Sequence, residues 1–290
     1  MSNKKILVLG ATGYVGSAAV KTLASLKANI TAGVRDPTKV KELEAAGASV
    51  VKVDMGQPQS ELASILKNYD HLYIVTPGHI DRTKLATNAI KAAQEAHIKY
   101  ILIVSITAAD NLEILFGRQF NPIEKELKLS GLNYGILRLP IFIDNIFGNV
   151  EHIKSHNSFY GPIDGDKKLV TVAIQDAALA AATILLNPSN HIGKTYVITS
   201  ELSSSDEQAQ SYSQALARPI KYVNGTFEGI RQAFLNFKMP EWQIDGILEL
   251  YKLIEKQEKS QVTFTNDFKT ITGKEPTTHL KYMQQISAAF

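Results

Sequence analysis

The glycine-rich stretch at residues 10–16, Gly-Ala-Thr-Gly-Tyr-Val-Gly, is the part of the sequence best suited to holding a phosphorylated ligand. It lies between an apolar run at residues 6–9 and a segment with apolar residues at helical spacing. Glycines at a strand-to-helix turn let a pyrophosphate approach the backbone, and the helix N-terminus attracts its charge. The alternative is a turn with a purely structural role. The residues expected to contact a dinucleotide here are Gly10, Thr12, Gly13, Tyr14, Val15 and Gly16.

A basic residue, Arg35, follows the second expected strand, about twenty residues after Gly16. An arginine at this place suits the 2′-phosphate of NADP(H), whereas NAD sites usually carry a carboxylate there. Lys39 lies one helical turn further on. Asp36 would favour NAD(H), although Asp36-Pro37 is also typical of a helix N-cap followed by a proline at the first helical position. We expect NADP(H) to be preferred over NAD(H).

Polar residues also follow the next three expected strands. Ligands of parallel sheets bind beyond the carboxyl ends of the strands, so these residues should run along the cofactor. Asp54 and Met55 would bracket the adenine, but Asp54 equally suits a cap of the next turn. Thr76 and Pro77 follow the fourth strand, and Ser105 follows the fifth. The alternative for these three residues is that they only form ordinary turns.

The elements that must position these residues alternate between strand and helix in the first half of the chain. Such alternation predicts βαβ units and a doubly wound parallel sheet. Strands are expected at residues 6–9, 30–34, 50–53, 72–75, 100–104 and 133–137. Helices are expected at residues 14–25, 37–46, 62–66 and 83–96, and from near Pro122.

The pattern changes near residue 150. We expect a nucleotide-binding domain at residues 1–150 and a smaller mixed α/β lobe at residues 151–290, part of which returns to the first sheet. Residues 155–168 are rich in Gly, Asp, Ser and Lys, which predicts a loop. A helix at 175–186, a strand at 195–199, a helix capped within 203–207 and a helix from Pro240 to residue 254 should follow.

The composition of the 290 residues excludes several classes of function. The 31 basic and 28 acidic residues lack the concentrated basic face or run of a nucleic-acid-binding protein, so no direct nucleic-acid partner is expected. The absence of cysteine excludes disulfides, Cys-ligated zinc, iron–sulfur clusters and a thiolate nucleophile. No HExxH or GxSxG motif is present, and no metal is expected.

Targeting and membrane segments are not expected either. The apolar run before Gly10 is too short for a signal peptide, and no apolar run reaches the ~20 residues of a membrane span. We expect a cytoplasmic protein, or a nuclear one if it is a eukaryotic regulator, with no membrane partner.

Several motifs together resemble the NmrA-like branch of the atypical short-chain dehydrogenase/reductases. They are the glycine stretch, the Val-Arg-Asp-Pro of strand two, residues 130–145 (SGLNYGILRLPIFIDN), residues 193–199 (GKTYVIT), residues 217–222 (ARPIKY) and residues 271–278 (ITGKEPTT). The resemblance covers essentially the whole chain and implies a Rossmann-type fold. It also implies either an NADPH-dependent quinone, dye or isoflavone-type reductase, or a non-catalytic redox-sensing regulator that docks on other proteins.

The choice between these activities depends on a proton donor, because hydride transfer to a carbonyl or quinone leaves an anionic oxygen. Classical members use a Tyr-x-x-x-Lys pair, and none of the 11 tyrosines has a lysine four residues later. The resemblance implies a lysine or histidine four residues before Glu124, where this chain has Phe120. The sequence therefore assigns no catalytic residue.

The resemblance also implies a substrate pocket beside the nicotinamide. Phe120, Pro140, Phe142 and Asn145 would form an apolar slot for a flat ring, although the two phenylalanines suit the core between the lobes equally well. Glu124 would orient a ligand or pair with a nearby base. His79 would lie over the nicotinamide or simply be solvated. Asp176 is interpreted as a helix cap.

These patterns lead to two main hypotheses. The preferred one is an NADP(H)-binding redox-sensing regulator with weak or no catalysis and a regulatory protein partner. The alternative is an NADPH-dependent oxidoreductase that transfers hydride to quinones or similar flat acceptors, with a small aromatic or quinone ligand. An NAD-linked sugar-nucleotide epimerase is disfavoured, because such enzymes ordinarily require the tyrosine–lysine pair.

Overall fold

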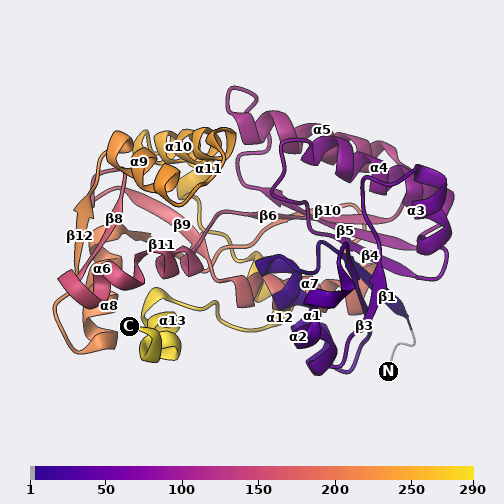
Figure 1. Ribbon diagram of the computed structural model, residues 1–290, viewed down its shortest axis with the longest axis horizontal. Helices are drawn as coiled ribbons and strands as arrows, with labels where there is room; N and C mark the ends of the chain where they lie inside the picture. Colours follow the sequence, from indigo (N-terminus) through magenta and orange to yellow (C-terminus); the bar gives the residue numbers. More distant parts are fainter. Residues whose placement is uncertain (1–3) are drawn as a thin grey trace.

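Seven parallel strands form the main sheet, in the spatial order β10-β6-β5-β4-β1-β2-β3 (Figure 1). The structure, a computed structural model, describes residues 4–290 except the side chain of Lys39. The strand order reverses between β1 and β4, and ligands of such sheets bind in the crevice at this point. The strands are β1 (Lys5–Leu9), β2 (Asn29–Val34), β3 (Ser49–Lys52), β4 (His71–Ile74), β5 (Tyr100–Ile106), β6 (Tyr134–Leu139) and β10 (Lys194–Val197).

Helices cover both faces of this sheet, because successive side chains of a strand point to opposite faces. In β1, Ile6 and Val8 belong to one buried cluster, and Leu7 and Leu9 belong to the other. The first cluster is covered by α1 (Tyr14–Ser25), α2 (Lys41–Ala45) and α7 (Ile174–Leu186), below the sheet in Figure 1. The second is covered by α3 (Gln59–Leu66), α4 (Arg82–Glu95) and α5 (Leu115–Leu129), above it.

The doubly wound α/β prediction is therefore confirmed. The second half of the chain contributes three elements to this layered unit. Helix α7 packs against α1, β10 extends the sheet beside β6, and α12 (Asp267–Thr272) packs against α7 and adds Phe268 to the same buried cluster.

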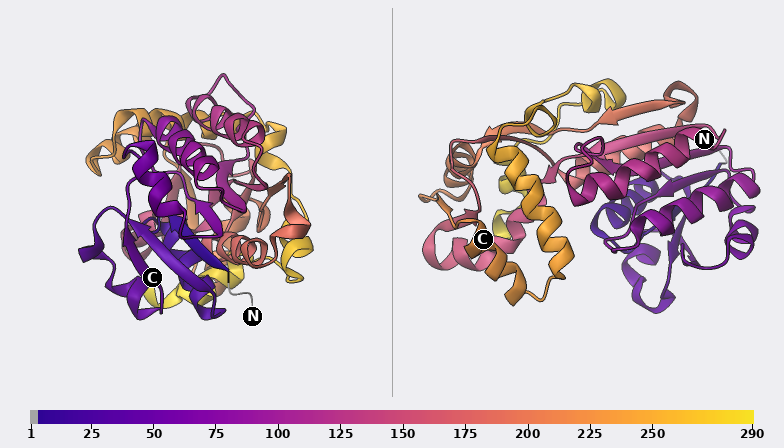
Figure 2. Two further views of the ribbon diagram at one scale, coloured as in Figure 1. Left: turned by 90° about the vertical axis from the view of Figure 1, so that its right-hand side faces the viewer. Right: turned by 90° about the horizontal axis from the view of Figure 1, so that it is seen from above.

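A smaller lobe lies beyond the carboxyl edge of the sheet, on the left of Figure 1 and again in the right panel of Figure 2. Its strands form a three-stranded sheet, β11-β9-β7, and a parallel pair, β12-β8. They are β7 (Ile141–Phe142), β8 (Ser158–Gly161), β9 (Lys168–Val172), β11 (Glu201–Ser204) and β12 (Lys221–Asn224). The helices of this lobe are α6 (Val150–His156), α8 (Ser205–Leu216), α9 (Phe227–Asn236), α10 (Glu241–Glu255), α11 (Lys259–Val262) and α13 (His279–Ile286).

Three expectations about elements were wrong. The segment 155–168 is no loop: it contains the end of α6, all of β8 and the start of β9, because β8 finds a parallel partner in the distant β12. Helix α5 begins at Leu115 and contains Pro122 in its interior. The expected helix at 37–46 is divided at Val40 into a 3₁₀ turn, Pro37–Lys39, and α2.

Of two helix caps expected from the sequence, the one within residues 203–207 is present and the one at Asp176 is not. Ser204 forms a capping box with Glu207 at the start of α8, which confirms a cap within 203–207. Asp176, in contrast, is no cap. It lies inside α7, is 4% exposed, and accepts hydrogen bonds from Ser200 Oγ at 2.6 Å and from Thr277 N at 2.7 Å. It therefore fixes the segment before α13 against α7.

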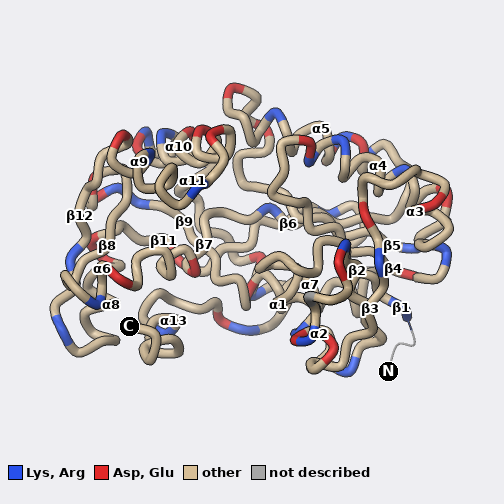
Figure 3. The backbone as a smooth tube through the Cα atoms, in the orientation of Figure 1, with Lys and Arg blue, Asp and Glu red and all other residues tan. Residues whose placement is uncertain are grey.

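Charged residues are distributed over the whole molecule. Lys and Arg alternate with Asp and Glu along the chain in Figure 3, without one face of a single sign in that view. No helix within residues 4–290 combines the length and apolar character needed to cross a membrane. In the same residues no three His, Asp or Glu side chains are grouped as metal ligands.

Candidate functional site

Two of the three glycines in the 10–16 turn are required by the packing of the chain itself. Gly10 has a φ of +76°, and a Cβ there would lie 2.4 Å from the carbonyl oxygen of Val75, which follows β4. A Cβ on Gly16 would lie 2.2 Å from the carbonyl oxygen of Gly10. The turn therefore sits tightly between the carboxyl ends of β1 and β4.

Gly13 differs from these two residues. Its φ of −77° and ψ of 165° suit any residue, and a Cβ there would meet only the carbonyl oxygen of Gly10, at an ordinary 3.6 Å. Nothing in the described chain explains a glycine at this position. The space that a side chain would fill lies at the N-terminus of α1, where no side chain caps the helix and no acidic residue occupies the first turn. Such an opening suits a phosphate group.

The neighbours of Gly13 have different surroundings. Thr12 is exposed, and Tyr14 is 87% exposed at the first position of α1. Val15 is buried in the core, so only its backbone is available to a ligand.

A pocket of about 300 Å³ adjoins this turn. It lies between the glycine turn and the segment after β2, where Asp36 caps the 3₁₀ turn by accepting from Thr38 N at 3.0 Å. The interpretation of Asp36-Pro37 as a cap is confirmed. Arg35 is exposed next to this segment, and the Lys39 side chain lies outside the described residues. The pocket is lined by Thr12, Ser17, Thr38, Val40, Lys41, Glu42 and Leu43.

Asp54 and Met55 form the turn after β3. Asp54 Oδ1 accepts from Gly56 N at 2.8 Å, so Asp54 caps this turn, and Met55 is 9% exposed. Asn88 of α4 donates to the carbonyl oxygens of Met55 at 2.7 Å and of Gln57 at 3.0 Å. The turn is thereby fixed to α4, beside a pocket of about 400 Å³ that Met55 helps to line.

The loop after β4 carries Thr76, Pro77 and His79. Thr76 and Pro77 are half-buried at the carboxyl edge of the sheet. His79 is exposed, and its Nδ1 accepts from Asp81 N at 3.1 Å. The structure places His79 in solvent, in a local turn that leads into α4.

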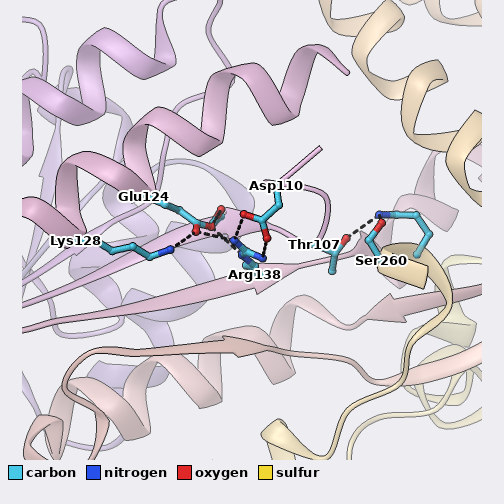
Figure 4. Close-up of polar contacts among 8 residues, drawn as sticks. Thr107, Asp110, Glu124, Lys128, Arg138 and Ser260 are labelled. Carbon is cyan, nitrogen blue, oxygen red and sulfur yellow. Dashed lines mark hydrogen bonds and ion pairs between the residues drawn. The ribbon is translucent and has the colours of Figure 1, made fainter. Parts of the chain in front are cut away.

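Ser105, near the end of β5, contacts an ionic network centred on the buried Glu124, and Figure 4 shows the charged members of this network. The Ser105 hydroxyl donates to Glu124 Oε1 at 2.6 Å. Arg138 of β6 donates to the same carboxylate through Nε at 2.9 Å and Nη2 at 2.7 Å, and also binds both oxygens of Asp110. Lys128, one turn along α5, adds a hydrogen bond to Glu124 at 3.1 Å.

This network keeps Glu124 ionised. Burial would raise the pKa of Glu124, but the hydrogen bonds from Arg138 and Ser105 outweigh it and lower the pKa. Burial would likewise lower the pKa of Arg138, whereas Glu124 and Asp110 raise it. Glu124 is thus paired with a nearby base, and neither it nor Ser105 is arranged as a proton donor.

The two phenylalanines of the expected apolar slot belong to different buried clusters. Phe120 is 4% exposed in the cluster under α4 and α5, whereas Phe142 is half-buried and packs against the opposite cluster. Pro140 is buried, and Asn145 is exposed.

Helices α10 and α11 join the smaller lobe to this edge of the sheet. Glu249 of α10 accepts from Leu115 N, the first residue of α5, at 2.6 Å. Gln261 of α11 donates to Thr107 Oγ1, just after β5, at 3.0 Å. The right panel of Figure 2 shows α10 crossing toward α5.

Comparison with known proteins identifies the family. The model of the NmrA-like family matches residues 2–283. The chain belongs to the NmrA-like family. The resemblance drawn from the motifs is thereby confirmed, and with it the membership in an NAD(P)-binding, Rossmann-type group.

Among curated proteins, this NmrA-like chain is 30% identical over 287 residues to an NAD(P)H azoreductase of Xenophilus azovorans, covering 98% of the chain and 99% of the relative. It is 27% identical over 248 residues to quinone oxidoreductase 2 of Escherichia coli (strain K12), covering 84% and 86%. Among solved structures, an NADPH-dependent quinone oxidoreductase from E. coli complexed with NADPH has a TM-score of 0.84 at 23% identity, covering 97% and 99%. A mutant NmrA has a TM-score of 0.76 at 17% identity, covering 98% and 96%, and these two structures show the fold.

Two basic residues of this NmrA-like protein were not assigned a role from the sequence. Arg138 interrupts an otherwise apolar strand, and that interruption is a signal that could have revealed a buried partner. Arg82 begins an ordinary amphipathic helix, and its sequence context carries no such signal.

Proposed function

We propose that this NmrA-like protein binds NADP(H) and is an NADPH-dependent reductase of quinones or similar flat, conjugated acceptors. The observation that carries the nucleotide site is the unfilled position of Gly13 at the uncapped N-terminus of α1. The likeness over nearly the full chain to an NAD(P)H azoreductase, and over most of it to a quinone oxidoreductase, supports the reaction class.

The described residues fit an NADP(H) molecule. The backbone of Gly13 and of the first turn of α1 would hold the pyrophosphate, because free N–H groups at a helix start bind anions. The turn formed by Asp54 and Met55 would border the adenine. Thr76 and Pro77 would lie along the cofactor toward the carboxyl ends of β4 and β5.

Preference for the phosphorylated cofactor is part of the proposal. Arg35, Lys41 and the hydroxyls of Thr12 and Thr38 border or neighbour the 300 Å³ pocket and suit a 2′-phosphate. Glu42 also lines the pocket, but its carboxylate is paired with Lys21 at 2.8 Å. The charge of this carboxylate is thereby offset.

The arrangement beyond β5 and β6 favours acceptors that need no protein acid. When bound, the reduced nicotinamide supplies a hydride to the acceptor. Glu124 is held by Arg138, the Ser105 hydroxyl already donates to Glu124, and Phe120 has no proton to give. A quinone that has received a hydride is a hydroquinone anion, and water protonates it, so the site need only bind, orient and shield the acceptor.

The decisive experiment follows NADPH consumption by the purified protein with a panel of quinones and azo dyes. We expect turnover well above the uncatalysed rate with at least one quinone, with one hydroquinone formed per NADPH consumed. Tight NADPH binding, measured by calorimetry, together with no turnover across the panel would overturn the reductase assignment.

That second outcome would favour a redox-sensing regulator. The observation that supports this candidate is that Glu124 is held ionised and that the Ser105 hydroxyl already donates to it, so neither is arranged to protonate an acceptor. In that case NADP(H) would act by favouring one position of the smaller lobe, and a protein partner would bind preferentially to the protein with the lobe in that position. Different affinities of a pulled-down partner for the NADP⁺ and NADPH forms would test this candidate.

A further inference from the structure

The guanidinium of Arg82 is a buried positive charge without a counter-ion in the described part of the chain. Arg82 begins α4 and is 8% exposed. Its Nε is a buried donor without a hydrogen-bond partner, and no carboxylate of residues 4–290 forms a salt bridge with it. An unpaired buried charge destabilises a fold, so its presence calls for a role beyond folding.

Aromatic rings surround this guanidinium. Its Cζ lies 4.8 Å from the ring centroid of Phe120, 5.1 Å from that of Phe116 and 5.9 Å from that of Trp242. The rings come from α5 and α10, so the main unit and the smaller lobe both contribute to this aromatic cage, which consists of Phe116, Phe120 and Trp242. Aromatic faces attract a cation but accept no conventional hydrogen bond, and the N–H groups stay available.

The guanidinium can still be reached from outside. Within residues 4–290 no hydrogen bond to its Nη1 or Nη2 is present, yet of the three nitrogens only Nε is both fully buried and unpaired. The two terminal nitrogens therefore retain accessible surface. Burial lowers the pKa of Arg82 to about 10, so the group is still a cation at neutral pH.

A second unpaired atom lies in the same seam between α4 and α5. Gln119 is 6% exposed, and its Oε1 is a buried acceptor without a partner, while its Nε2 donates to Ile80 O at 3.1 Å. Thr83, next to Arg82, donates to the carbonyl oxygen of Gln119 at 2.8 Å. Unpaired buried polar atoms are rare in native proteins and mark places where a ligand or water completes the site.

We propose that Arg82 is a specificity residue that binds a carboxylate or sulfonate group of a flat aromatic acceptor. The planar fork of a guanidinium matches the oxygens of either group, and the surrounding rings match an aromatic body. The loop after β4, which carries Thr76 and Pro77, leads directly into Arg82, so this position adjoins the carboxyl edge of the sheet. The proposal rests on the reductase function proposed above and names its acceptor class.

The test compares naphthoquinone with its ring-sulfonated derivative in the wild-type protein, in Arg82→Met and in Arg82→Lys. Arg82→Met should lower kcat/KM for the sulfonated quinone about tenfold or more, and change it less than about twofold for the uncharged quinone. Arg82→Lys should retain part of the preference, because it keeps the charge and loses the fork. Equal losses for both quinones would overturn the proposal.

A binding measurement separates this proposal from the reductase function. If the wild-type protein reduces no acceptor of the panel, the reductase function fails, and calorimetric titration with naphthalene sulfonate still tests Arg82. Binding that Arg82→Met abolishes would support the anion site, and binding that it leaves unchanged would overturn it. A weakened NADPH affinity in Arg82→Met would place the guanidinium at the cofactor, which would also overturn the assignment.

Thermal melting distinguishes a ligand site from a structural clamp. Methionine keeps much of the packing of the arginine stem and removes the unpaired charge, so Arg82→Met should melt at the same or a higher temperature. A marked fall in melting temperature would show that the cation holds α4, α5 and α10 together, which contradicts the proposal.

Discussion

Arg138 binds Glu124 through two nitrogens, at 2.9 Å from Oε1 and 2.7 Å from Oε2, and the same guanidinium holds both oxygens of Asp110. One cation from β6 thus neutralises carboxylates from α5 and from the loop before it. The pair is largely shielded from water, since the side chain of Glu124 is 1% exposed and that of Arg138 is 13% exposed. This network joins β6 to α5 and to the loop before it.

Arg138→Met should destabilise the protein strongly. It leaves the Glu124 carboxylate buried with only Ser105 and Lys128 as partners, and breaking a buried ion pair costs about 3–5 kcal/mol. Urea denaturation of the single variant and of the double variant Arg138→Met/Glu124→Gln measures this cost. The double variant should recover part of the loss, because no unpaired carboxylate remains. A single variant as stable as the wild type would contradict this account of the pair.

The buried histidine His279 should make stability depend on pH. Burial lowers the pKa of His279 to about 3, and its ring nitrogens lie 2.8 Å from Tyr212 OH and 3.0 Å from Thr171 Oγ1. The unfolded chain binds a proton at a pKa of about 6.5, so its free energy falls relative to that of the folded state as the pH drops below this value. Stability should be full above pH ~6.5 and decrease down to pH ~3.

Denaturant titrations between these pH values measure this effect. In the variant His279→Gln, whose amide keeps one donor and one acceptor, the slope of stability against pH should become shallower by about one proton. The variant His97→Gln, the same substitution at an exposed histidine, is the matched control. Equal slopes in wild type and His279→Gln would be inconsistent with a neutral buried histidine.

Gly13→Ala should separate nucleotide binding from folding. The added Cβ meets only one atom, at 3.6 Å, and the backbone φ of −77° suits alanine, so the melting temperature should hardly change. The same methyl group would occupy the space proposed for the pyrophosphate, and NADPH should bind about tenfold or more weakly. Calorimetry and thermal melting are the two measurements.

Gly16→Ala is the contrasting variant. Its Cβ would lie 2.2 Å from the carbonyl oxygen of Gly10, so it should lose stability. Full NADPH affinity in Gly13→Ala would remove the main support for the nucleotide site.

Arg35→Asp should reverse the preference between the two cofactors. A carboxylate repels a 2′-phosphate and accepts a hydrogen bond from a 2′-hydroxyl, so NADPH affinity should fall far more than NADH affinity. Lys52→Asp, another exposed basic residue at the end of a neighbouring strand, controls for net charge. Equal losses for both cofactors in Arg35→Asp would rule out a phosphate contact at this residue.

The main sheet and its covering helices could be predicted from the sequence because the pattern that indicates each element lies within that element. Strands such as β1 and β5 are continuous apolar runs, and α1 and α7 have apolar residues at helical spacing, so each element was predicted from its own residues. Caps made within a few residues, such as that of Ser204, were also predictable. The glycine turn could be placed because its strand and helix lie on either side of it.

The errors and omissions arise from contacts between distant parts of the chain. β8 is defined by its pairing with β12, and the start of α5 is capped by Glu249, which lies far along the sequence. Asp176 had the right type for a cap but is used by Ser200 and Thr277 instead. The cage around Arg82 needs rings from two other helices, so no local pattern could have indicated it.

The return of the chain to the first sheet has a consequence for the smallest fragment that can fold. Helix α7 supplies Ala177, Ala181 and Leu185 to the core that α1 covers, and β10 occupies the edge next to β6. A polypeptide that stops at residue 150 would leave this alanine-lined seam open to water and one strand edge unpaired, and both features promote aggregation. The nucleotide-binding half is thus not an autonomous module, and biosynthesis must pass residue 197 before its hydrophobic layer can close.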